Sequence, residues 1–235
     1  MFIVLLSLSL CLMSIKSYML EKELLIALDN KGERVATKFL KEHPEILTYS
    51  FNWTAGHSMY VLNEFPISSR YGTDFVVLLS YSGTWEINFI ELENTDDMVI
   101  TQAGKPSQRF NSAISQINDW HEYIERNRQS IQKDLSDWCM KKDLLKWSCN
   151  DKPPTNFSGN ELKDPDSFLI IKYHIVIGRR QNITKEIRRK MNQYTRMAGL
   201  STHTFDRFVD IAKNFDKHHA SPETSVCLTE TNELA

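Results

Sequence analysis

The alternation of apolar and polar positions divides the N-terminal part of the chain into two helices and a strand. Apolar residues recur at helical spacing over residues 20–30 and again over residues 33–42. The second helix is expected to end before Pro44, because the residue that precedes a proline disfavours helical geometry. An apolar run at residues 59–62 predicts the first strand.

A β-hairpin is predicted in the next apolar stretch. Its two segments, residues 75–81 and 85–92, are rich in Val, Ile, Leu and aromatic side chains, a composition typical of buried strands. Between them, Ser82-Gly83 fits a two-residue hairpin loop. The loop also predicts which residues of the two strands face each other, because the register of a hairpin follows from its turn.

Three carboxylates fall at the open end of this hairpin. With Tyr81 paired to Thr84, the register places Asp74 directly opposite Glu91, and strand alternation returns Glu93 to the same face. Like charges that face each other on a sheet are unfavourable. The ordinary compensation is a divalent cation such as Mg²⁺, which prefers carboxylate oxygens. The alternative is that the strand ends are solvated and the three acids do not meet.

The rest of the chain continues the alternation of helices and strands. Apolar spacing, caps and Pro or Gly breaks predict a helix at 107–130 with a second segment to 145, a loop at 148–167, a strand at 168–178, and helices at 184–198 and 205–215. The strand at 168–178 is hydrophobic almost throughout, as expected when both of its faces are covered. This order of elements predicts an α/β fold, a mixed central sheet flanked by helices.

The predicted organisation is a hydrophobic leader at 1–18, one domain at 19–216 and a disordered polar tail at 217–235. The apolar run Phe2–Ile15 is too short for a comfortable membrane span. It resembles a signal-peptide core, although no positive charge precedes it and no clear cleavage site follows; a true start at Met19 is the other interpretation. We expect a cytoplasmic protein without a stable membrane partner, or an exported one if the leader is a signal peptide.

Composition narrows the function classes. The chain has 235 residues, enough for one domain with a substantial core, and four cysteines without a CxxC pair, which argues against a zinc ribbon. Its formal net charge of −2 gives no global attraction to nucleic acid, so DNA binding would need a local basic patch. Candidate members of such a patch are Arg179, Arg180, Arg188, Arg189 and Lys190. The alternative is that these residues form an ordinary solvated surface.

Several short motifs in a fixed order narrow the picture further. They are FLKEHPEIL, TDFVVL, FIELEN, GKPSQRFNSAISQINDW, IVIGRR and STHTFDRFVDIA. With them the sequence resembles the Shedu antiphage defence family, the SduA-type nuclease domain of the PD-(D/E)XK superfamily. The resemblance extends over Glu33–Phe215 and fades through Ser136–Asp166. It implies a PD-(D/E)XK, restriction-endonuclease-like core.

The resemblance also implies roles for particular residues. Asp74 and Glu91 match the metal-binding acids of the family, with Mg²⁺ or Mn²⁺ as the cofactor, and Gln116 matches the glutamine on the helix behind the site. Glu93 occupies the place where a lysine is commoner. A lysine would steady the attacking hydroxide, whereas a glutamate would add a metal ligand or act as general base.

Two functions of different classes follow. The first is a metal-dependent DNA endonuclease that nicks or cuts DNA during antiphage defence. The second is a catalytically silent protein of the same fold that binds nucleic acid or a partner protein, and the departure at Glu93 keeps it open. The resemblance also suggests a homo-oligomer, with DNA as the principal partner.

Overall fold

The computed structural model describes residues 17–29, 33–51, 58–141, 145–147 and 153–215. The predicted tail at 217–235 and residues 1–16 of the predicted leader lie outside the described residues. Within the described part of the chain, no helix has the length and apolar character needed to cross a membrane.

A six-stranded mixed sheet forms the centre of the fold, in the order β4-β1-β2-β3-β5-β6. Its strands are β1 (Ser58–Asn63), β2 (Phe75–Ser80), β3 (Thr84–Leu92), β4 (Leu145–Trp147), β5 (Phe168–Val176) and β6 (Ser201–His203). The strands β4, β1, β2 and β3 pair antiparallel, whereas β3–β5 and β5–β6 pair parallel. The predicted mixed sheet is confirmed, and it brings the carboxyl ends of β3, β5 and β6 to one edge.

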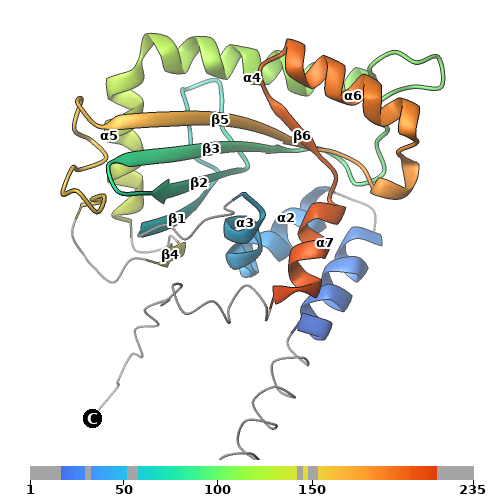
Figure 1. Ribbon diagram of the computed structural model, residues 1–235, viewed down its shortest axis with the longest axis horizontal. Helices are drawn as coiled ribbons and strands as arrows, with labels where there is room; N and C mark the ends of the chain where they lie inside the picture. Colours follow the sequence, from blue (N-terminus) through green and yellow to red (C-terminus); the bar gives the residue numbers. More distant parts are fainter. Residues whose placement is uncertain (1–16, 30–32, 52–57, 142–144, 148–152, 216–235) are drawn as a thin grey trace, which may run out of the picture.

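Helices cover both faces of this sheet (Figure 1). One face carries α4 (Gln108–Arg126), α5 (Arg128–Cys139) and α6 (Lys185–Met197). The other carries the helical residues 17–29 together with α2 (Glu33–Glu42), α3 (Pro44–Phe51) and α7 (Asp206–Lys213). A short 3₁₀ turn, η1 (Arg180–Asn182), links β5 to α6. The result is an α/β protein with its sheet between two helical layers.

The alternation of side chains along β2 and β3 divides the core into two clusters. On β2, Val76 and Leu78 pack on the α4 side, whereas Phe75, Val77 and Leu79 pack on the α3 and α7 side. All six residues of β2 are buried, because the strand lies in the middle of the sheet with helices above and below it. The face to which each carboxylate of the hairpin points is therefore fixed by the packing of its apolar neighbours.

The structure adds two short strands that the sequence did not predict, β4 and β6, and it differs from the expectations in other places. Helix α3 begins at Pro44, where only the end of α2 was predicted; proline is well tolerated in the first turn of a helix. The predicted helix at 107–130 divides at Asn127, which ends α4 and begins α5. The prediction that both faces of β5 are covered is wrong for the first half of the strand, where Phe168 and Ile170 are exposed. The reason is that α3 and α7 cover only the half of β5 that ends at Val176.

Candidate active site

The hairpin of β2 and β3 has the predicted register. Ser80 faces Trp85 and Phe75 faces Ile90, while the amide of Tyr81 donates to the carbonyl of Thr84 at 2.9 Å. The two-residue loop is thereby confirmed. Continued by one pair beyond Phe75, this register sets the chain of Asp74 against that of Glu91.

Asp74, directly before the first residue of β2, is held by one hydrogen bond to its side chain and one to its backbone carbonyl. Its Oδ2 accepts from the amide of Leu92 at 2.7 Å, which ties the side chain to the end of β3. Its carbonyl accepts from the amide of Glu64 at 3.0 Å. Glu64 has a positive φ of 50°, an uncommon conformation for a residue other than glycine and one that clusters at functional sites. The backbone at Glu64 thus directs its amide toward the carbonyl of Asp74.

Glu91 is bound by the helix that covers this face of the sheet. Gln116 of α4 donates from Nε2 to Glu91 Oε1 at 2.8 Å. Helix α4 is fixed at its start by Ser107, whose hydroxyl accepts from the amide of Phe110 at 3.1 Å, as predicted. The buried face of α4 then places Gln116 at the sheet, next to the buried Ile117. The amide donor and the carboxylate acceptor are therefore positioned by two different elements.

Burial raises the pKa values of both facing carboxyls. Burial, followed by the charges of Asp74 and Glu93, raises the pKa of Glu91 to about 9, against the hydrogen bond from Gln116. Burial likewise raises the pKa of Asp74 to about 6, against the opposing hydrogen bond from Leu92. Two facing carboxylates with raised pKa values are stabilised by a proton or a cation that offsets their charge.

Glu93 lies beside the pair in a buried position of its own. Its amide donates to the carbonyl of Val176 at 2.8 Å, which continues the alignment of β3 with β5. Burial raises the pKa of Glu93 to about 7, and the positive charge of the Arg109 guanidinium opposes this rise. Gly178, with a φ of 66°, lets the loop after Glu93 approach closely, since a Cβ there would lie 2.3 Å from the carbonyl oxygen of Asp97. Glu93 therefore has a defined position.

Glu33 and Arg109 are among the charged residues that act on this site and that sequence reasoning missed. Glu33, the first residue of α2, raises the pKa of all three acids, and Arg109 lowers that of Glu93. An acidic residue in the first turn of a helix is commonplace because it complements the helix dipole, so the sequence pattern does not single out Glu33. Arg109 stands near the start of α4, two residues after the helix cap, and no local pattern connects it with β3.

The donors fit a divalent cation, although they do not form a complete three-carboxylate site. Among the described residues, no group of three His, Cys, Asp or Glu side chains is placed to hold a metal ion together. The structure thus brings Asp74 and Glu91 together without drawing Glu93 into the same group. Mg²⁺ is typically held by one or two carboxylates and retains several waters. A facing pair of oxygen donors with raised pKa values meets that requirement.

The basic residues divide into paired and open groups. Arg179 donates to Asp206 and to Asp29, both at 3.3 Å, and its side chain is only 12% exposed. Arg180 binds Asp210 through its two terminal guanidinium nitrogens. Both arginines therefore tie the end of β5 to neighbouring helices, and their role as DNA contacts stays a prediction.

The basic residues of α6 are more accessible. Arg188 and Arg189 are exposed, whereas Lys190 is half-buried, lies 3.3 Å from Glu186 and covers Gly104. The exposed pair on α6 is therefore the better placed part of the predicted basic patch.

Gln116 provides a direct test of the site's geometry. Replacing it with leucine, which has a similar size, is expected to reduce any metal-dependent activity by about 10- to 100-fold, because a hydrogen-bond partner that orients a metal ligand has effects of this size. Metal affinity is expected to fall in parallel, measured by titration of the metal-dependent melting temperature. Replacement of the exposed Gln193 on α6 is the matched control. Unchanged metal affinity in Gln116→Leu would contradict the assignment.

Comparison with known proteins identifies the region that carries these features. A family model described as Shedu protein SduA, C-terminal, matches residues 30–209. The match includes the hairpin, α4, β5 and α6, and thus Asp74, Glu91, Glu93, Gln116 and the basic residues between positions 179 and 190. No curated protein matches the chain.

Proposed function

Since the chain belongs to the Shedu family, which indicates a role in antiphage defence, we propose that it is a metal-dependent endonuclease that nicks or cuts DNA. The observation that carries the proposal is the opposition of Asp74 and Glu91 at the end of one hairpin, with Gln116 bound to Glu91. A half-buried pair of facing carboxylates is destabilising unless a proton or a cation offsets its charge. Binding Mg²⁺ or Mn²⁺ is the purpose that suits these donors.

A nuclease core of the PD-(D/E)XK type is the corresponding proposal for the fold. It is supported by an aspartate at the start of β2, a glutamate near the end of β3 and a glutamine on the helix that packs against them. The antiparallel hairpin followed by the parallel strand β5 is compatible with this assignment.

In this mechanism, Asp74 and Glu91 would hold the cation, and Gln116 orients Glu91. When bound, the metal would supply charge stabilisation at the scissile phosphate and would lower the pKa of water. Glu93 accepts the proton of the attacking water. Its pKa of about 7 suits this role, because a general base works best when its pKa is close to the working pH.

Arg109 supplies a positive charge beside Glu93, in place of the charge that a lysine at position 93 would carry. Its guanidinium is the principal influence that lowers the pKa of Glu93, so it lies close enough to stabilise negative charge beside that residue. It forms an ion pair with Asp97 at 4.0 Å, and its side chain is largely exposed, so a phosphate can approach it from solvent.

A plasmid-nicking assay tests the proposed activity. Supercoiled and linear DNA are incubated with the full chain and either Mg²⁺, Mn²⁺ or EDTA. The expected result is conversion to nicked or cut product with either metal and none with EDTA. Absence of product with both metals and both DNA forms would contradict the endonuclease assignment.

A catalytically silent protein is the second candidate. It is favoured by Glu93 in place of the commoner lysine and by the lack, among the described residues, of a three-carboxylate metal group. Such a protein would bind DNA in a gel-shift assay without cleaving it. Self-association, implied by the resemblance, stays a prediction that sedimentation velocity can measure.

The exposed basic surface of α6 is the proposed contact for the DNA backbone. Replacing Arg188 and Arg189 with glutamine is expected to weaken DNA binding and to reduce the slope of log K against log salt by about two, because each lost phosphate contact releases about one counterion fewer. Thermal stability should not change, since both side chains are exposed. The measurement is a salt series of binding isotherms.

Lys133, an exposed residue of α5, offers a matched control for this experiment. Its replacement by glutamine also removes a positive charge but should leave the salt slope as it is. An unchanged slope in the double α6 variant would show that this helix faces away from the DNA.

A further inference from the structure

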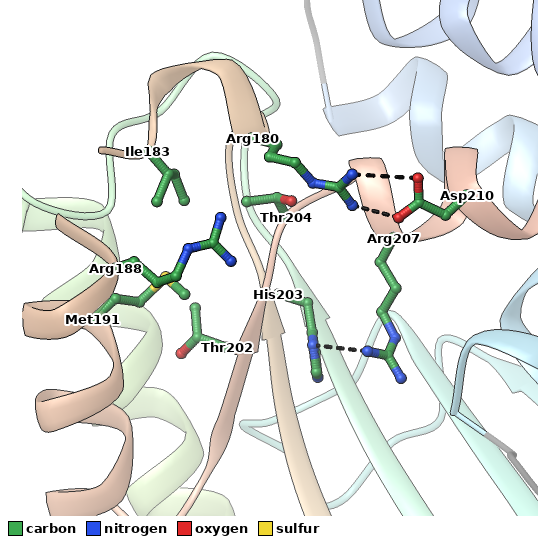
Figure 2. A pocket seen from close by; sticks show the side chains of 9 residues that line it. All are labelled: Arg180, Ile183, Arg188, Met191, Thr202, His203, Thr204, Arg207 and Asp210. Carbon is green, nitrogen blue, oxygen red and sulfur yellow. Dashed lines mark hydrogen bonds and ion pairs between the residues drawn. The ribbon is translucent and has the colours of Figure 1, made fainter. Parts of the chain in front are cut away.

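The outer edge of strand β5 is paired over only part of its length. Strand β3 pairs with all of β5, whereas β6 pairs with β5 only at residues 174–176. There the edge is closed by β6 and α7, with His203 of β6 lying 3.5 Å from Arg207 of α7 (Figure 2). Over residues 168–173, no strand in the described part of the chain pairs with the outer side of β5. This segment is hereafter the β5 edge.

The backbone groups that point outward from the β5 edge belong to alternate residues. The amide of Ile177 donates to β6 at 2.9 Å, whereas the carbonyl of Val176 accepts on the β3 side at 2.8 Å. Because backbone groups alternate in direction along a strand, the amides and carbonyls of Leu169, Ile171 and Tyr173 point away from β3. A row of this kind is a template on which a further strand can pair.

Apolar side chains accompany this row of backbone groups. Phe168 is 64% exposed and Ile170 is 38% exposed, and strand alternation places both on the face that α3 and α7 leave uncovered at this end of the sheet. Lys172 follows on the same face, but Glu86 binds it at 2.7 Å. Proteins usually protect an open edge with charges, prolines or bulges, and residues 168–173 have no proline and only this paired charge. The edge therefore has the properties of a surface that another chain covers.

A stripe of exposed polar residues on α4 and at the start of α5 follows the β5 edge. Nδ1 of His121 lies 3.4 Å from the hydroxyl of Tyr173, and Arg128 donates from Nη2 to the carbonyl of Leu169 at 3.4 Å. Glu125, one helical turn after His121, lies between these two contacts, and after burial its charge raises the pKa of Tyr173. Within the described residues, neither Glu125 nor Arg128 forms an ion pair. An anion and a cation thus stand side by side along the edge without partners of opposite charge.

We propose that the β5 edge is an interface with a second copy of this chain, in which two β5 strands pair antiparallel about a twofold axis. Pairing of the outward groups sets Leu169 against Ile171 of the second copy and Ile170 against its own copy. Because the strand direction reverses, Arg128 of each copy approaches Glu125 of the other. The edge thus complements itself in its backbone, apolar and charged groups, as a twofold contact requires and a contact with an unrelated peptide does not.

This interface lies at the end of the sheet opposite to the carboxylate site. Phe168 is beside Thr84 at the hairpin loop, whereas Glu91 is beside Ile175. Seven residues along β3 separate these two places, a distance of about 23 Å at about 3.3 Å per residue. The contact joins two six-stranded sheets into one continuous sheet without using either carboxylate site. It does not depend on nuclease activity, so either proposal can fail alone.

Sedimentation velocity of the full chain, without DNA or divalent metal, tests the interface. Protein concentrations from about 1 to about 100 µM cover the Kd range of a dimer of moderate affinity, and a monomer–dimer equilibrium is expected. Glu125→Arg and Arg128→Glu each place like charges together twice per dimer, so each is expected to raise the Kd about tenfold or more. The two exchanges combined in one chain restore opposite charges and should return the Kd close to that of the wild type.

A variant of the apolar centre and a control complete the set. Ile170→Lys places two positive charges face to face on the twofold axis and should leave the protein monomeric. Lys133→Glu changes the charge of an exposed residue of α5 that lies away from the stripe, and it should keep the wild-type Kd. Cooperative melting of each variant confirms beforehand that it is folded.

Hydrogen exchange of the peptide that contains residues 168–173 identifies what covers the edge. For a second copy, protection of these amides should rise with protein concentration. Protection that does not change on dilution would assign the edge to another segment of the same chain and overturn the proposal. A monomer at the highest concentration would overturn it as well, as would a Kd unchanged by Ile170→Lys or a combined charge exchange that fails to restore association.

Discussion

Asp74→Asn and Glu91→Gln are each expected to abolish metal-dependent cleavage while they raise the melting temperature of the metal-free protein. Activity should fall by about three orders of magnitude, because a bound metal contributes several kcal/mol of transition-state stabilisation and each 1.4 kcal/mol is about tenfold in rate. The variants keep the size of the side chains, so the packing between the hairpin and α4 should survive. The combination of lost activity and gained stability is the diagnostic result.

The gain in stability follows from the direction of the pKa shifts. In the folded protein the pKa of Glu91 is raised from 4.5 to about 9, and that of Asp74 from 3.8 to about 6. When the pKa of a carboxyl is higher in the folded than in the unfolded protein, its contribution to stability is fully present at pH values below the unfolded pKa. This contribution is lost as the pH rises through the folded pKa. At neutral pH the metal-free pair therefore destabilises the fold, and an amide at either position removes this cost.

Differential scanning fluorimetry in EDTA and in Mg²⁺, together with the nicking assay, measures both effects. Addition of Mg²⁺ should raise the melting temperature of the wild type and have little effect on either variant, since only a folded site binds the metal. Glu122→Gln is the control, an exposed acid of α4 that pairs with Arg126 on the helix surface. Full cleavage by Asp74→Asn would falsify the site.

Glu93→Gln is expected to reduce the cleavage rate by about 10²- to 10⁴-fold, the usual contribution of a general base. Metal binding by Asp74 and Glu91 should persist, because Glu93 does not form part of their group. The Mg²⁺-dependent rise in melting temperature is therefore retained, whereas the rate is lost. This separation of rate from metal affinity distinguishes a base from a ligand.

Glu93→Lys introduces the residue that is commoner in the family, and it is expected to retain more activity than Glu93→Gln. A lysine at this place steadies the attacking hydroxide, with Arg109 still beside it. Asp96→Asn, an exposed acid in the following loop, is the control. A wild-type rate in Glu93→Gln would make the residue a bystander, whereas loss of the metal-induced shift would make it a ligand.

Local patterns were sufficient to predict the parts of the fold that depend on near neighbours. The bounds of α2 agree with the predicted 33–42, and Ser107 and the start of α6 were anticipated because helix caps and periodicity are local. The opposition of Asp74 and Glu91 was predictable for the same reason, since a two-residue turn fixes the register of a hairpin. The place of Gln116 behind the site came from the family resemblance. No local rule predicts its hydrogen bond to Glu91, a strand residue 25 positions away.

The sequence by itself determined the α/β class, the hairpin with its opposed acids and the family. The tertiary structure decided which charges meet. Arg179 and Arg180, predicted as DNA contacts, form ion pairs with Asp29, Asp206 and Asp210, which no local pattern connects with them. The short strand β6 had too few residues for a periodic signal, and it forms only because packing brings residues 201–203 beside β5. Periodicity reports the environment of each residue along its own element, whereas contacts between distant elements arise only when packing brings them together.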